Sequence, residues 1–555
     1  MLGLKGRRSP TPTPQSAICN PHSALRTSHS WAYLSRTAVV LIALAGLNTL
    51  LGYGRDILLA AWYGASPQTD AFFVGSYVPL LVQQLVIVGS LVPAFLPVLA
   101  QTSTPSPDGD AERRRLVRDM SLVASGIGLL LAAALWLAAP TVVGLVAPGL
   151  APASAGLAAS VLRLSLPMVL FIAPSGVLSA ALNYQGRFIA PALAAAATNA
   201  FVVLSLAVSG PANGITAAAI GMSIGGLCGL LVAGRQWSAV SGQPSAVSGS
   251  HSALRTPHSA IKRVFALAVP LLAMVGLAQF VGVVERQIGS RLGPGSLSLL
   301  AYAMKLNLLP VMILAGTVST VLFPRLAREE QAEEFSRSLG RGISQVLTWT
   351  VPASAWLLVC ADPALRLLYQ HGVFTEADGR QSARILAAYA VGIVPFALLQ
   401  VLPRAYHARQ DMLRPLGLYA LGVGAYLGLA PALSAAWGAV GLAAAFSAYN
   451  YCSLGLFVWG LRGHLRAQAG VILGTLGRSV AAGLFMAAVC FGLQAALPGL
   501  ADGGLIGRAA LVALLGIGGL GAYAASMALT AGGRLPRTRR HRDLQETSDA
   551  TLPGP

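Results

Sequence analysis

The sequence is dominated by a succession of apolar runs, each about long enough to cross a membrane. A transmembrane helix needs about 20 predominantly apolar residues, and runs of this kind recur from about residue 38 to residue 531 without a long polar interval. The chain is 55% hydrophobic and 10% charged, with a mean hydropathy of +0.67, whereas soluble domains carry about 25% charged residues. These features predict an all-α integral membrane protein.

Fourteen such runs can be counted, and the basic residues between them predict their orientation. The runs lie near 38–60, 71–99, 117–146, 157–182, 188–209, 212–234, 264–284, 297–323, 343–369, 383–403, 413–433, 438–460, 471–497 and 505–530. Of the 38 Lys and Arg residues, 29 fall in the terminal segments and in alternate connections. The opposite connections near 61–70, 147–156, 210–214 and 434–437 contain none. The positive-inside rule therefore predicts that both termini are cytoplasmic.

Two internal repeats suggest that the membrane body consists of two similar halves. AFLPVLA at 94–100 is echoed by VLFPRLA at 321–327, and Tyr184-x-x-Arg187 is echoed by Tyr406-x-x-Arg409. We expect two parallel six-helix lobes, an arrangement that alternating-access transporters use, followed by two extra C-terminal helices. The predicted segments are a disordered N-terminal segment 1–36, an N-lobe 37–234, a cytoplasmic inter-lobe loop 235–263 with a low-complexity repeat, a C-lobe 264–462, two further spans in 463–531, and a basic cytoplasmic tail 532–555.

Several other classes of protein are disfavoured by the composition. The net charge of +19 could indicate nucleic-acid binding, but the basic residues follow the membrane topology instead. The five cysteines are scattered singly, without a CxxC pair or metal-ligand spacing, so we expect neither disulfides nor a metal or other cofactor. The predicted outer connections hold only scattered acids, among them Asp362, Glu376, Asp378 and Asp502. Without a paired-carboxylate motif, an enzyme such as a membrane glycosyltransferase is not expected.

Ionisable residues inside the apolar runs are the candidate functional groups, because each costs roughly 2.5–3.5 kcal/mol at the bilayer centre unless it has a partner or water. Arg55 and Lys305 could hold an anionic head group in a central cavity, since Arg donates two parallel hydrogen bonds to a phosphate. Asp70 could order the arginine, take part in gating, or simply cap a helix N-terminus. Arg55 with Asp56, and Glu285 with Arg286, could instead be mutual pairs or interface anchors.

The residues also resemble a known family. The run GYGRDILLAAWYGASPQTDAFFVGSYVP at 52–79, followed by PAFLPVLA, is similar to the MurJ/MviN lipid II flippases of the MOP exporter superfamily. Further resemblance lies in LNYQGRFIAPALAAAATN (182–199), YAMKLNLLP (302–310), LYQHGVFT (368–375) and YHARQD (406–411). The resemblance implies an inner-membrane carrier that moves the lipid-linked peptidoglycan precursor outward through a cationic cavity between two lobes.

Carried over by position, the resemblance places Arg55, Asp70 and Lys305 at substrate-binding positions of the family. Gln83 and Gln84 stand where the family usually has a basic pair, and Asn48-Thr49 where it has an arginine. Met304 replaces an aspartate, and Val88-Gly89 a Glu-Gly pair. The remaining candidates for the cavity or for gating are Glu285, Arg286 and Asn307.

The expected function is therefore translocation of lipid II by alternating access, with membrane lipids and cell-wall synthesis proteins as partners. Because several cavity charges are missing, export of another polyprenyl-diphosphate oligosaccharide is the nearest alternative. Drug export on a related fold is a third reading. A transport-inactive scaffold of the same fold is the alternative from a different class.

Overall fold

The protein is described here from a computed structural model that defines residues 28–101, 107–240, 257–312, 331–409, 411 and 413–530. Every element of regular structure in these ranges is helical. The elements are α1 (Ser28–Tyr63), α2 (Pro67–Val82), a π-helix (Gln83–Leu91), α3 (Val92–Gln101), α4 (Pro107–Leu137), α5 (Ala139–Val146), α6 (Pro152–Ser165), α7 (Pro167–Tyr184), α8 (Ile189–Val240), α9 (Pro257–Gly289), α10 (Ser296–Pro310), α12 (Ala332–Tyr369), α13 (Glu376–Ala390), α14 (Ile393–Leu398), α15 (Leu402–Ala408), α16 (Leu413–Gly460), α17 (Arg462–Leu465), a 3-10 turn (Arg466–Gln468), α18 (Ala469–Ala496), α19 (Pro498–Asp502) and α20 (Gly504–Thr530). The all-α prediction is confirmed.

Ten of the described helices are long and apolar enough to cross a membrane, or eleven if the bent pair Glu376–Ala390 and Ile393–Ala408 is one span. The sequence predicted about fourteen spans, so the number of continuous helices is smaller. The difference arises partly from α8 and α16, which are 52 and 48 residues long. At 1.5 Å per residue each would be more than twice as long as the hydrocarbon core is thick.

Both long helices are in fact folded back on themselves. In α8 the backbone breaks at Gly210, where φ is +64°, a value that glycine adopts without strain. Beyond the break, a Cβ on Gly225 would lie 2.5 Å from the Cα of Thr198. In α16 the break falls at Gly438, and the rings of Tyr426 and Tyr449 on either side of it are 5.6 Å apart. Each is thus an antiparallel hairpin of two spans.

The eighth predicted run accounts for a further difference. Only its first part, α10, is described as an α-helix, and residues 313–330 lie outside the described residues. When each hairpin is counted as two spans and the bent pair is added, the described helices account for thirteen of the fourteen predicted spans, and α10 is the described part of the remaining one. Of the predicted terminal and inter-lobe segments, residues 1–27, 241–256 and 532–555 lie outside the described residues. Helix α1 begins at Ser28, within the predicted N-terminal segment 1–36.

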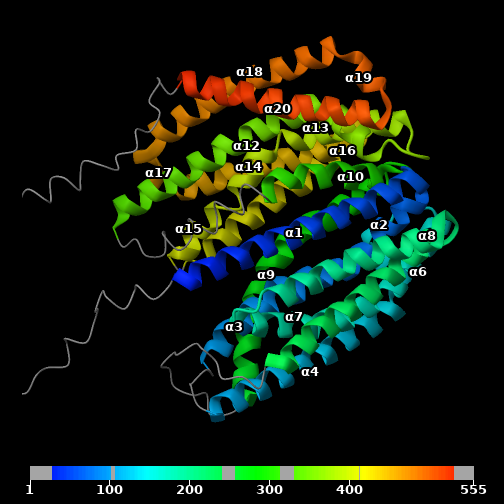
Figure 1. The fold of residues 1–555 in the computed structure, drawn as a ribbon, viewed down its shortest axis with the longest axis vertical. Helices are drawn as coiled ribbons and strands as arrows, with labels where there is room; N and C mark the ends of the chain where they lie inside the picture. Colours follow the sequence, from blue (N-terminus) through cyan, green and yellow to red (C-terminus); the bar gives the residue numbers. More distant parts are fainter. Residues whose placement is uncertain are drawn as a thin grey trace, which may run out of the picture.

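The helices form two groups that follow the sequence. The N-terminal group, from α1 to α8, fills the lower half of the molecule, and the C-terminal group, from α10 to α16, fills most of the upper half (Figure 1). Helix α9 joins them, since it packs against the π-helix of the first group and against α16 of the second. The last two long helices, α18 and α20, pack on each other and on α12 at the outer edge.

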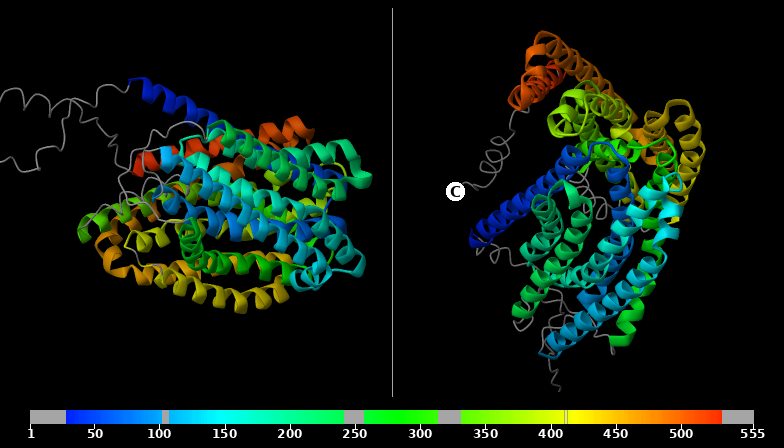
Figure 2. Two further views of the ribbon diagram at one scale, coloured as in Figure 1. Left: turned by 90° about the horizontal axis from the view of Figure 1, so that it is seen from below. Right: turned by 90° about the vertical axis from the view of Figure 1, so that its right-hand side faces the viewer.

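The two groups are connected at one end of the bundle. The Val373 amide donates to the Ala61 carbonyl at 2.8 Å, and the Gly149 amide donates to Ser290 Oγ at 3.1 Å. We call this region, formed by residues 61–66, 145–151, 287–295 and 370–375, the joined end. Helix α1 begins and α20 ends at the opposite end (Figures 1 and 2), so the described ends of the chain lie on the same side.

Candidate functional site

One face of α1 carries a row of polar groups that faces the centre of the molecule. Asn48, Gly52 and Asp56 are spaced four residues apart, so they lie above one another on the helix. Helix α10 approaches this face, because the Tyr53 hydroxyl donates to the backbone carbonyl of Lys305 at 2.9 Å. The two helices belong to different groups, so the row lies where the two halves of the molecule meet.

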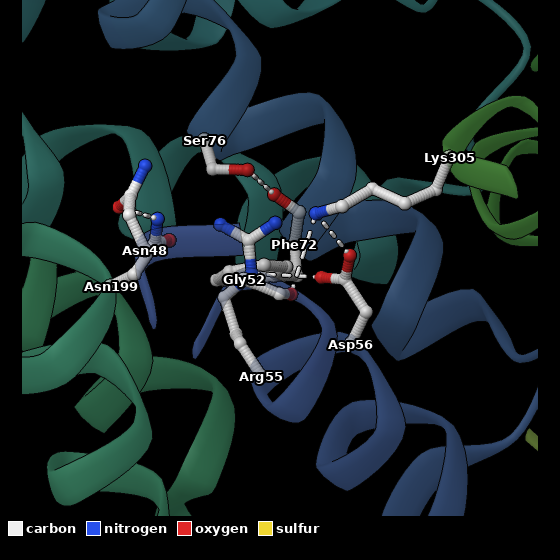
Figure 3. A network of polar contacts seen from close by, with 8 residues as sticks. All are labelled: Asn48, Gly52, Arg55, Asp56, Phe72, Ser76, Asn199 and Lys305. Atoms are coloured by element: carbon white, nitrogen blue, oxygen red, sulfur yellow. Dashed lines mark hydrogen bonds and ion pairs between the residues drawn. The ribbon is translucent and has the colours of Figure 1, made fainter. Parts of the chain in front are cut away.

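Asp56 is shared by two cations. Arg55 Nε donates to Asp56 Oδ1 at 2.8 Å, and Lys305 Nζ donates to Asp56 Oδ2 at 2.7 Å (Figure 3). The Asp56 side chain is 4% exposed, whereas that of Arg55 is 16% and that of Lys305 is 29% exposed. A buried carboxylate is costly unless it is paired, and here both of its oxygens are. The Arg55–Asp56 pair is one of the alternatives that the sequence left open, whereas the sharing of Asp56 with Lys305 was not predicted.

The same cluster contains a neutral pair that the sequence analysis missed. Asn199 Nδ2, on α8, donates to Asn48 Oδ1 at 3.0 Å (Figure 3). Lys305 Nζ also donates to the Gly52 carbonyl at 3.3 Å, and a Cβ on Gly52 would lie 3.4 Å from Nζ and 3.7 Å from Asn199 Nδ2. Asn199 was visible only as a polar residue in an apolar run, which is a weak signal.

Asp70 is bound elsewhere than expected. Its carboxylate accepts hydrogen bonds from the Gly295 amide at 2.6 Å and from the Ser298 amide at 2.7 Å, and also from the Ser298 hydroxyl. It therefore caps the N-terminus of α10 from the first turn of α2. The carboxylate that contacts Arg55 is Asp56 rather than Asp70, so an ordering role for Asp70 on Arg55 would have to act through α10.

Glu285 and Arg286 do not form a mutual ion pair. Glu285 accepts a hydrogen bond from the Tyr389 hydroxyl of α13 at 3.0 Å. The Arg286 guanidinium stacks 3.5 Å from the centre of the Tyr77 ring of α2 and donates to the Gly282 carbonyl at 3.0 Å. The two side chains thus attach α9 to opposite halves of the molecule, in keeping with its position between them.

The other sequence candidates lie outside the Asp56 cluster. Gln83 is half-buried and Gln84 is exposed, and both lie at the start of the π-helix. Asn307 is fully buried on α10, where its Nδ2 lies 4.0 Å from Met304 Sδ and its Oδ1 has no hydrogen-bond partner among the described residues. Their roles in the cavity stay predictions.

The cluster is suited to holding an anion. Arg55 uses only Nε on Asp56, and none of the described residues accepts a hydrogen bond from its two Nη atoms. A phosphate could therefore accept two parallel N–H hydrogen bonds from Arg55 and be attracted by the ammonium charge of Lys305.

A family model described as Lipid II flippase MurJ matches residues 59–501. The chain is 30% identical over 387 residues to the lipid II flippase MurJ of Burkholderia cenocepacia, an alignment that covers 68% of this chain and 73% of that protein. It is 26% identical over 457 residues to the probable lipid II flippase MurJ of Vibrio cholerae, covering 77% and 83% of the two chains.

Among solved structures, the fold is similar to that of a lipid II flippase MurJ in an inward closed conformation. The TM-score is 0.73 with 20% sequence identity, and the match covers 88% of this chain and 98% of that one. An inward-facing MATE family multidrug resistance transporter of the MOP superfamily is less similar, with a TM-score of 0.59, 14% identity, and coverage of 78% and 99%.

Proposed function

The chain belongs to the family of the lipid II flippase MurJ, and on this premise we propose that it carries lipid II from the cytoplasmic to the outer leaflet of the bacterial inner membrane by alternating access. The family is one of transporters rather than enzymes. The observation that carries the proposal is the placement of Asp56 between Arg55 and Lys305.

The mechanism follows from the exchange of one anion for another. In the unloaded protein Asp56 satisfies both cations, which lowers the cost of keeping them in the membrane. An entering diphosphate would offer more oxygens and more negative charge than one carboxylate. Arg55 would then direct its two Nη atoms to the phosphate, while Lys305 would rotate its flexible stem away from Asp56.

The two cations come from different halves of the molecule, and this can couple binding to movement. Arg55 lies on α1 of the N-terminal group and Lys305 on α10 of the C-terminal group. A head group held by both would favour the conformation in which the halves are close at that level. A ligand shifts a conformational equilibrium only by its differential affinity for the two states, and a bridging diphosphate supplies such a difference.

Charge bias gives the proposed orientation. The joined end includes two of the connections, 61–70 and 147–156, that lack Lys and Arg, so it would face the outside. The substrate would then enter from the cytoplasmic side, where both termini would also lie. Cell-wall synthesis proteins on the outer side are proposed to receive the product.

The proposal is tested in a host whose own lipid II flippase can be depleted. The chain should restore survival and prevent accumulation of lipid II on the inner leaflet, and Arg55→Ala or Lys305→Ala should abolish both effects at equal expression. Arg163→Ala is the matched control, because this arginine also lies in a span but donates to the Trp136 carbonyl at 3.2 Å and stacks on the Trp136 ring. Normal transport by both cavity variants would refute the diphosphate mechanism and favour a scaffold.

A second substrate is supported by the Asn48–Asn199 pair. Where the family usually has an arginine, this chain has a neutral amide that is already bonded to another amide. Neutral amides suit a sugar hydroxyl as well as a phosphate oxygen, which would fit another polyprenyl-diphosphate oligosaccharide. Rescue of a polysaccharide exporter mutant, without rescue of the lipid II flippase depletion, would identify this alternative.

A further inference from the structure

A long apolar groove lies on the outer side of the C-terminal group, away from the Asp56 cluster. It has a volume of about 670 Å³ and is lined by residues of α12, α14, α15, α16, α17 and α18. Neither α1 nor α10 contributes to its lining. On α18 the lining runs from Ala469 to Leu484, which at 1.5 Å per residue is about 22 Å, most of the roughly 30 Å hydrocarbon core.

The wall of the groove is suited to hydrocarbon. Its aliphatic side chains include Leu473 and Leu484 on α18, which are 63% and 67% exposed. The two polar side chains along its length are already bonded within the protein, because Ser354 donates to the Ala390 carbonyl at 2.6 Å and Tyr451 to the Val391 carbonyl at 3.1 Å. An acyl chain would therefore meet no unsatisfied polar group along the groove.

One end of the groove carries two arginines. Arg462 and Arg466 both line it and are spaced four residues apart, so they lie on the same side of the short helical segment between α16 and α18. Both are exposed, and in the described part of the chain neither forms an ion pair with a carboxylate. The groove thus combines an apolar trough with uncompensated positive charge at its mouth.

An aromatic ring sets the level of this mouth in the membrane. Trp459 is 62% exposed, and the Arg462 guanidinium lies 5.1 Å from the centre of its ring. Exposed Trp residues are enriched at the level of the lipid head groups. The arginines would therefore lie beside the phosphates of the leaflet, and basic pockets between helices on the cytoplasmic side are known to bind anionic head groups.

We propose that this groove binds an anionic phospholipid of the membrane, with its phosphate between Arg462 and Arg466 and an acyl chain along α18. The site is separate from the proposed transport site, because no helix that bears Arg55 or Lys305 lines the groove. The bound lipid would fill the space between α16 and α18 and attach the last two spans to the C-terminal group.

The test uses the purified full-length chain in neutral detergent, titrated with dioleoyl phosphatidylglycerol or dioleoyl phosphatidylcholine. Bound lipids are counted by native mass spectrometry, and the unfolding midpoint is measured in parallel. Phosphatidylglycerol should bind and stabilise more strongly than phosphatidylcholine. In the double variant Arg462→Ala/Arg466→Ala the affinity for phosphatidylglycerol should fall about thirtyfold. Each Lys or Arg near the membrane surface contributes about 1 kcal/mol of binding free energy, and about 1.4 kcal/mol corresponds to a factor of ten in affinity.

Two further variants separate the groove from general surface charge. Arg337→Ala/Arg414→Ala removes two exposed arginines that do not line the groove, and it should leave phosphatidylglycerol binding unchanged. Leu473→Trp fills the trough without altering charge and should weaken binding while the arginines remain. The Arg462→Lys/Arg466→Lys variant should keep most of the affinity.

Several outcomes would overturn the proposal. These are equal binding of the two phospholipids, unchanged binding by Leu473→Trp, and equal stabilisation by glycerol 3-phosphate, which has no acyl chain. Displacement of phosphatidylglycerol from the groove by undecaprenyl diphosphate would assign the groove to the transported lipid instead. A change in oligomeric mass rather than in lipid count in the double variant would assign it to a second copy of the chain.

Discussion

The carboxylate of Asp70 on α2 accepts a hydrogen bond from the backbone amide of Ser298 at 2.7 Å. The N-terminus of α10 is thus capped by a side chain from another helix, 228 positions earlier in the chain. Asp70 is 2% exposed and Ser298 is fully buried. Helix α10, which carries Lys305, is therefore held at its first turn by a residue of the N-terminal group. The position of Lys305 therefore depends on this contact.

Asp70→Ala should destabilise the protein by about 1–3 kcal/mol, because it leaves two buried amide donors without an acceptor. Ser298→Ala should destabilise the protein less, since the hydrogen bond from the backbone amide of residue 298 to Asp70 is retained. The measurement is the unfolding midpoint in detergent. Asp378→Ala is the control, because the Asp378 carboxylate also accepts a hydrogen bond from a backbone amide, that of Thr375 in the capping box of α13, but does so near solvent. An equal loss in this variant would contradict the burial argument.

Arg55→Lys should retain part of the transport that Arg55→Ala loses. Lysine keeps the charge beside Asp56 but cannot present two parallel donors to a phosphate. The measurement is the rate of lipid II appearance on the outer leaflet. If the lysine and alanine variants were equally inactive at normal expression and stability, charge would not be the property that matters at this position.

A disulfide between Ala61→Cys and Val373→Cys should stop transport, and a reductant should restore it. The Val373 amide donates to the Ala61 carbonyl at 2.8 Å, so the two positions are adjacent across the joined end, which must open if the substrate is to leave there. A disulfide between Ala194→Cys and Gly229→Cys, within the α8 hairpin, should leave transport unaffected. Full activity with the first disulfide formed would exclude opening of this end.

Reporter fusions should show which end of the bundle lies on the cytoplasmic side of the membrane and which on the external side. A reporter placed after Pro536 should read as cytoplasmic, and one placed between Pro148 and Ala155 as external, because the connections on the two sides differ so strongly in Lys and Arg content. Reversed signals would overturn the orientation and, with it, the proposed direction of transport.

The apolar runs predicted the helices well because burial in lipid leaves the backbone few alternatives. The break at Gly210 falls in the predicted gap between two runs, and the break at Trp437 and Gly438 falls where the predicted gap 434–437 meets the next run. The pairing of side chains was harder to predict from the sequence. Whether Lys305 would share Asp56 with Arg55 depends on how α10 packs against α1, and no local pattern specifies that arrangement. Asn199 was missed for the same reason, since its partner Asn48 lies 151 residues earlier.

The folded-back form of α8 and α16 has a consequence for biogenesis. In each hairpin the two arms are adjacent in sequence, so their contacts close only short loops. The contact between Asp70 and Ser298, by contrast, cannot form until the whole N-terminal group and α9 have been made. Contacts of short sequence separation form fastest. During synthesis each hairpin should therefore enter the bilayer as a paired unit, and a ribosome-stalled chain ending shortly after α8 should already protect the interface between its arms from thiol labelling.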